Sequence, residues 1–142
     1  YIGYIEKISG SPLSSCEKLR RIVLGEEDTI QAALMCVFPI KFYLESYSES
    51  HVVKTLIKNG YEKYNALITA VLEEGIRNGE FQTCLPVSEL AKFITGAIDG
   101  LAFQNLLVSS EKPEVPRSLL FSVLDRILTP IHPTPRKEVS ND

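Results

Sequence analysis

The sequence is poor in cysteine, in basic charge and in long apolar runs, and each shortage argues against a class of protein. Its 142 residues include three cysteines, Cys16, Cys36 and Cys84, without zinc-type spacing, so we expect reduced thiols and no metal site. Fifteen basic against eighteen acidic residues give a net charge of −3, which disfavours DNA binding by this chain itself. The longest strictly apolar run, residues 32–38, is far too short to span a membrane.

Side chains that could carry catalysis are also sparse. The two histidines, His51 and His132, have no metal-binding or catalytic partner near them in the sequence. Glu73 and Glu74 occupy adjacent positions, which face different directions on a helix, so we interpret them as a solvated surface. The basic residues of the segment 18–21 receive the same interpretation. No glycine-rich phosphate loop follows a strand, and we therefore expect no enzyme and no cofactor.

The spacing of apolar residues is helical nearly throughout, and no stretch shows the sustained alternation of a strand, so we predict an all-α domain. Helices are expected over residues 1–9, 15–24, 29–47, 51–78, 87–108 and 117–128. Pro39 should kink or split the third of these, and Asn78-Gly79 should end the fourth. Ser14 and Glu17 have the spacing of a capping box, in which each side chain accepts the other residue's backbone N–H.

Gly96 and Gly100 lie four residues apart within an otherwise good helix, where each glycine costs about 1 kcal/mol relative to alanine. Close approach of another helix or of a ligand would offset that cost. Two explanations remain open: a symmetric four-helix interface between two copies of the chain, or packing within the monomer. Asp99, between the glycines, is expected to be an exposed charge or the partner of a lysine or arginine across the contact.

Several polar residues interrupt apolar helix faces. Asn65 and Thr69 follow Tyr61 at intervals of four, and Asn105 follows Leu101 at the same interval. A buried polar group left unpaired costs about 1–3 kcal/mol, so these residues either satisfy one another or helix carbonyls, or line a pocket and orient a ligand. The pocket interpretation gives these candidate lining residues: Met35, Phe38, Phe42, Tyr43, Tyr61, Tyr64, Asn65, Thr69 and Asn105.

The segment from Leu67 to Phe81 contains a helix, then Gly75, three residues, and Gly-Glu-Phe at 79–81. This order resembles the corresponding pattern of TetR-type transcriptional regulators. Residues 90–101 and 119–128 are similar, in the same order, to that family's next helices. The resemblance is strongest over 61–108 and is weaker but collinear over 1–60 and 116–128.

The resemblance implies a helical bundle of the TetR C-terminal-domain type, in which the last two helices form a four-helix dimer interface. Residues 1–9 would be the end of a helix that connects to a missing N-terminal DNA-binding domain. Residues 10–128 would be the effector-binding and dimerisation domain. Independently of the resemblance, Pro130, Pro133 and Pro135 predict a disordered tail over 129–142. The implied interface residues are Phe93, Gly96, Gly100, Phe103, Gln104, Leu120, Leu124 and Ile127.

On this resemblance we expect the ligand-sensing and dimerisation domain of a cytoplasmic, TetR-like regulator. Its partners would be a second copy of the chain, a small hydrophobic or aromatic effector, and operator DNA bound only through the missing N-terminal domain; no membrane is involved. Because the chain begins with Tyr1 rather than methionine, we expect a fragment or a processed chain. The alternative is a standalone helical protein-interaction module without a small-molecule ligand.

Overall fold

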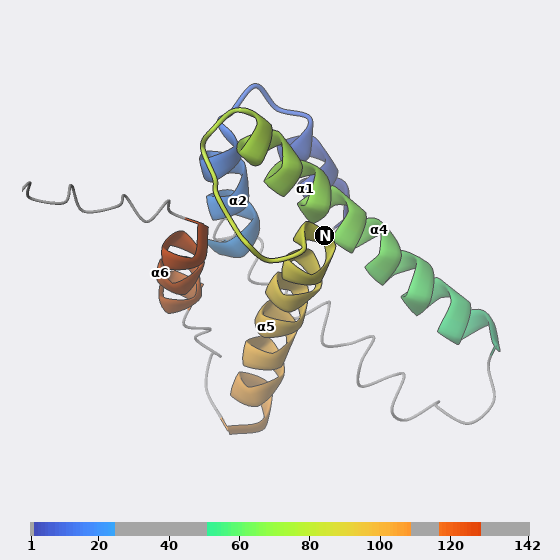
Figure 1. Cartoon of the computed structure of the whole chain (residues 1–142). Helices are drawn as coiled ribbons and strands as arrows, with labels where there is room; N and C mark the ends of the chain where they lie inside the picture. Colours follow the sequence, from blue (N-terminus) through green and yellow to red (C-terminus); the bar gives the residue numbers. More distant parts are fainter. Residues whose placement is uncertain (1, 25–50, 109–116, 129–142) are drawn as a thin grey trace, which may run out of the picture.

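The computed structural model describes residues 2–24, 51–108 and 117–128, and every regular element within these ranges is a helix (Figure 1). The helices are α1 (Ile2–Ser9), α2 (Ser15–Leu24), α4 (His51–Arg77), α5 (Val87–Val108) and α6 (Arg117–Leu128). The all-α prediction is confirmed, and these five helices agree with their expected ranges to within a residue. The helix expected over 29–47 and the tail 129–142 lie outside the described residues.

The long helix α4 contacts α1, α2 and α5, while α6 packs mainly against α2 (Figure 1). The apolar faces that the sequence spacing predicted meet in one core. Burial of each large aliphatic side chain in such a core contributes about 1.5–3 kcal/mol, so these faces hold the helices together. The largest fully buried apolar side chains are Ile5, Leu19, Ile22, Ile68, Leu72, Ile94, Leu124, Val23 and Val71.

Lys18 is not solvated, contrary to the sequence-based interpretation. Only 5% of its side chain is exposed, and its ammonium donates to both carboxylate oxygens of Glu74, at 3.0 and 2.8 Å. The aliphatic stem of a lysine can cross an apolar contact as long as its charged end finds a partner. The pair therefore joins α2 to α4, and Glu74 is only partly solvated, with 35% of its side chain exposed.

Only one of the two hydrogen bonds of the predicted capping box forms at the start of α2. The Ser14 hydroxyl accepts the backbone N–H of Glu17 at 3.2 Å, as predicted. The carboxylate of Glu17 instead accepts a hydrogen bond from Arg21 Nε at 2.8 Å. Glu80 completes the cap from a distant part of the chain, since its two carboxylate oxygens accept the backbone N–H groups of Ser15 at 3.1 Å and Cys16 at 3.0 Å. Each of these bonds satisfies a donor that the first turn of a helix leaves free.

The predicted stop at the end of α4 is confirmed. Gly79 has a φ of 74°, a left-handed conformation that favours glycine. Its N–H donates to the carbonyl of Ile76 at 3.1 Å, and the N–H of Glu80 donates to the carbonyl of Gly75 at 2.8 Å. This turn directs the chain away from the α4 axis and places residues 80–82 between α2 and the end of α6.

Candidate functional site

The candidate pocket residues on α4 occupy two different environments. Tyr61, Asn65 and Thr69 are partly buried and lie along one line of the helix, whereas Tyr64 is buried in the core. Met35, Phe38, Phe42 and Tyr43 lie outside the described residues, as does the side chain of Asn105. The part of the pocket interpretation that the structure describes is therefore the α4 line and what faces it.

Two polar pairs connect that line to α5. The Tyr61 hydroxyl donates to Asp99 Oδ2 at 2.7 Å, and the Thr95 hydroxyl lies 2.7 Å from Asn65 Oδ1. Asp99 is partly buried, and burial raises the pKa of its carboxyl above the ordinary value of 3.8, while the hydrogen bond from Tyr61 lowers it. Asp99 was expected to be an exposed charge or to pair with a basic residue, and its observed partner is a neutral hydroxyl of the same chain. Sequence reasoning did not single out Thr95.

The outer surface of α5 and α6 exposes large apolar side chains. Phe93 is 53% exposed, Leu119 64% and Val123 41%. Gly96 and Gly100 lie on the same exposed side of α5. Apart from the adjacent residues and the backbone of α5 itself, no atom of the described residues comes within 4 Å of where a Cβ would stand on either glycine. Within the described chain, no close packing offsets the cost of these glycines. We call Phe93, Gly96, Gly100, Leu119 and Val123 the α5–α6 surface.

The other candidate interface residues differ in exposure. Gln104 is exposed and Phe103 is partly buried. Leu120 and Leu124 belong to the core of the single chain, at 6% and 0% exposure, and Ile127 packs against that core. On α6 it is thus Leu119 and Val123, one position earlier in each turn, that remain uncovered.

The Gly-Glu-Phe turn has a structural role in each of its residues. Gly79 ends α4, Glu80 caps α2, and the ring of Phe81 lies directly against Gly75, where a Cβ would collide with it. The next residue, Gln82, donates its backbone N–H to the carbonyl of Leu128, the last residue of α6, at 3.0 Å. The turn therefore links α4 to both α2 and α6, and Gly75 is needed for close approach of the ring.

The family model described as "Tetracyclin repressor-like, C-terminal domain" matches residues 23–116, well over half of the chain. The chain belongs to this family. The match contains all of α4, the turn and α5, which carried the resemblance seen in the sequence. No curated protein and no solved structure matches the chain. Tetracyclin repressor-like C-terminal domains are, in general, the ligand-binding and dimerisation parts of transcriptional regulators.

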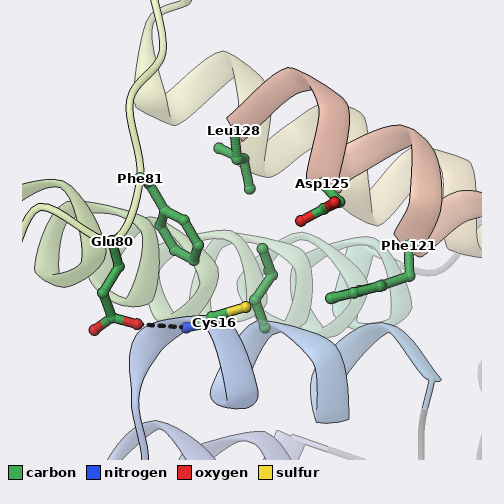
Figure 2. A pocket seen from close by; sticks show the side chains of 7 residues that line it. Cys16, Glu80, Phe81, Phe121, Asp125 and Leu128 are labelled. Atoms are coloured by element: carbon green, nitrogen blue, oxygen red, sulfur yellow. Dashed lines mark hydrogen bonds between the residues drawn. The ribbon is translucent and has the colours of Figure 1, made fainter. Parts of the chain in front are cut away.

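A small hollow in this tetracyclin repressor-like domain lies between α2, the turn and α6 (Figure 2). Its volume of about 50 Å³ is well below the roughly 300–1,000 Å³ of sites for drug-sized ligands, so it is no effector cavity. Burial, followed by the charges of Asp125 and Glu80, raises the pKa of the Cys16 thiol in its wall, which disfavours a reactive thiolate. The lining residues are Cys16, Leu19, Glu80, Phe81, Phe121, Asp125 and Leu128.

The described part of the domain offers no alternative chemical centre. Over residues 2–24, 51–108 and 117–128, no group of histidine, cysteine and acidic side chains could hold a metal ion. Cys16 and Cys84 are free and exposed. None of the described helices is long and apolar enough to cross a membrane. The α4–α5 polar pairs and the α5–α6 surface remain the two features with functional potential.

Proposed function

We propose that this chain is the effector-sensing and dimerisation domain of a TetR-like transcriptional regulator. Two copies associate through α5 and α6, and each copy binds a small, largely apolar or aromatic effector beside α4 and α5. Effector binding then controls operator binding by a separate N-terminal domain of the full-length protein. This control requires that the effector bind the two DNA-affinity states with different strengths.

The uncovered α5–α6 surface is the observation that carries the dimer proposal. Phe93 is exposed on the same side of α5 as two open glycines, and Leu119 and Val123 are exposed on α6, so that a partner covering these helices would gain free energy by burying them. Glycines without neighbours allow a second helix backbone to approach closely, which offsets their cost in helix stability. A second copy of the chain, related by two-fold symmetry, would present the same surface and be complementary to it.

The partly buried line of Tyr61, Asn65 and Thr69 supports effector binding. These residues carry polar groups where α4 faces α5, beside the apolar core, and a combination of apolar walls with a few polar groups orients ligands in protein pockets. The further candidates Met35, Phe38, Phe42, Tyr43 and Asn105 would supply an aromatic and polar remainder. The core residue Tyr64 would contribute from beneath this line.

Light scattering coupled to size exclusion tests the dimer. The chain has a mass of 15.9 kDa, and we expect twice that mass at micromolar concentration. Gly100→Leu should give monomers, because its side chain occupies the space needed by the partner helix. Ala70→Leu, on an exposed position of α4, is the matched control and should remain dimeric. Circular dichroism of both variants would show that each is folded.

A monomeric wild type, or a dimer unchanged by Gly100→Leu, would refute the proposed interface. A thermal-shift screen of apolar and aromatic compounds tests the sensing function, since a ligand that binds only the folded state raises its melting temperature. Absence of any stabiliser from a dimeric chain would favour a helical protein-interaction module without a small-molecule ligand.

A further inference from the structure

Asp99 differs from two other described carboxylates at helix contacts, Glu74 and Glu6, in the charge of its partner. Glu74 faces a buried ammonium and Glu6 pairs with Lys63 at 2.6 Å, whereas the partner of Asp99 within the described residues is the neutral hydroxyl of Tyr61. No lysine or arginine among the described residues is placed to neutralise Asp99. Partial removal of a carboxylate from water without a counter-charge is unfavourable, and the raised pKa of Asp99 expresses that cost.

The nearest turns of α4 and α5 do not supply the missing charge. Lys58 lies within 3.7 Å of Glu62 on α4, and Lys92 lies 2.9 Å from Glu89 on α5. All four side chains are more than half exposed, so both pairs belong to the solvated surface. Among the residues that the structure describes, no basic side chain therefore neutralises Asp99.

The neighbouring pair, Asn65 and Thr95, adds further oxygen atoms that can accept hydrogen bonds. The Thr95 hydroxyl has one proton but two acceptors within reach, Asn65 Oδ1 at 2.7 Å and the Ala91 carbonyl at 3.1 Å. If the Asn65 amide is turned, its nitrogen donates to the Thr95 hydroxyl, which then donates to Ala91, and both contacts are satisfied. The carbonyl oxygen of Asn65 would then have no hydrogen bond within the described residues, as is already the case for the second carboxylate oxygen of Asp99. The cluster offers hydrogen-bond acceptors and one negative charge.

We propose that the cluster of Tyr61, Asn65, Thr95 and Asp99 binds a positively charged group of the effector, an ammonium or an amidinium, with Asp99 as its counter-ion. A cation of this kind supplies a positive charge opposite Asp99, and its N–H groups donate hydrogen bonds to the acceptor oxygens of Asp99 and Asn65. The proposal rests on the proposed effector-binding function, and it narrows the ligands to apolar or aromatic compounds that also carry a cation.

Calorimetry with matched compounds tests the charge preference. The probes are phenyl-, naphthyl- and biphenyl-methylammonium, each compared with the alcohol and the carboxylate on the same ring system. For at least one ring system, the wild-type chain should bind the ammonium compound at least tenfold more tightly than the alcohol, and the carboxylate least. In Asp99→Asn, the affinity for the ammonium compound should be close to the affinity for the matched alcohol. Glu73→Gln, the same charge change at an exposed position of α4, should leave the ratio of the two affinities unchanged.

A second variant separates the contribution of the Asp99 charge from that of the Tyr61 hydroxyl. Tyr61→Phe should keep the preference for the ammonium compound, because the carboxylate that carries it remains. If Asp99→Asn does not fold, Asp99→Ser serves in its place. The free Asp99→Asn domain should also melt at a higher temperature than wild type at pH 7, since an uncompensated charge has been removed.

The outcomes distinguish this inference from the proposed function. Tight binding of alcohols or carboxylates with no loss in Asp99→Asn would overturn the inference and leave effector sensing intact. Failure of every neutral, anionic and cationic compound to bind would remove both. Loss of dimerisation in Asp99→Asn, without a change in ligand preference, would show that Asp99 pairs with the second copy and would also overturn the inference.

Discussion

Alanine at position 75 is expected to destabilise the domain, although glycine-to-alanine changes inside helices usually stabilise by about 1 kcal/mol. The ring of Phe81 occupies the space that a Cβ on Gly75 would take. Phe81 is a core residue with 7% of its surface exposed, so the added methyl group must displace a buried ring. Loss of its burial costs about 1.5–3 kcal/mol and overpacking about 1–3 kcal/mol, and together these exceed the gain in helix propensity. After subtraction of that gain, we expect a net loss of about 1.5–5 kcal/mol in the free energy of unfolding.

Gly60→Ala is the matched control, because it makes the same change on the same helix with room available. The nearest atom to a Cβ on Gly60 is Cδ1 of Ile2 at 3.9 Å, an ordinary contact. Gly60→Ala should therefore stabilise the domain, by up to about 1 kcal/mol. Urea unfolding followed by circular dichroism measures both changes, and one fixed protein concentration keeps the mass-action contribution of any dimer dissociation the same for all variants.

The double variant Gly75→Ala, Phe81→Leu tests the mechanism. If the methyl group acts by displacing the ring, the double variant should lose less stability than the sum of the two single changes. Strict additivity would show that the two positions do not interact. Stabilisation by Gly75→Ala, similar to that by Gly60→Ala, would refute the argument that the glycine is required by the ring.

Two further predictions concern the ion pair and the cap on α2. Glu74→Gln should lower the free energy of unfolding by about 2–4 kcal/mol, because it leaves the buried ammonium of Lys18 unpaired. Lys18→Met should lower it by only about 1–2 kcal/mol, because water reaches the carboxylate of Glu74 that remains. Equal losses for the two variants in urea unfolding would contradict this reasoning. The pKa of Glu80 is held below its ordinary value of 4.5, chiefly by the hydrogen bond from the Cys16 N–H. This stabilisation is therefore present above pH 4.5 and is lost as the pH falls through the lowered pKa. Glu80→Gln should weaken the loss of stability on acidification, and an unchanged pH profile would exclude this role of Glu80.

The helices could be predicted from the sequence because their signals are local. Apolar spacing fixed which face of α4 is buried, and Gly79 and Ser14 marked helix ends through bonds to residues a few positions away. The partners of Lys18 and Glu80 could not be predicted in this way. Lys18 bonds to a residue 56 positions away, and Glu80 bonds to a backbone N–H 65 positions away. Periodicity describes one helix at a time and does not report which distant group meets it.

The candidate site was predictable to the same extent. Polar residues on an apolar stripe singled out Tyr61 and Asn65, but their partners Asp99 and Thr95 depend on how α4 and α5 are aligned. On α6, two neighbouring stripes share the same helical spacing: 119 with 123, and 120 with 124. Packing of α6 against α2, and to a smaller extent against α5, buries the second stripe and leaves the first exposed.

Gly75 differs from Gly96 and Gly100 in whether the described chain offsets the cost of a glycine in a helix, and this difference bears on the proposed dimer. At Gly75 the chain itself supplies the group that needs the missing side chain, since Phe81 fills the space and gains burial there. At Gly96 and Gly100 the described chain supplies no such group, although each glycine carries the same cost of about 1 kcal/mol. Phe93, on the same side of α5, and Leu119 and Val123, on α6, add exposed apolar surface that is equally uncompensated within the described residues. A single partner that covers the α5–α6 surface offsets both costs at once, and a second copy of the chain meets that requirement with the surface already present.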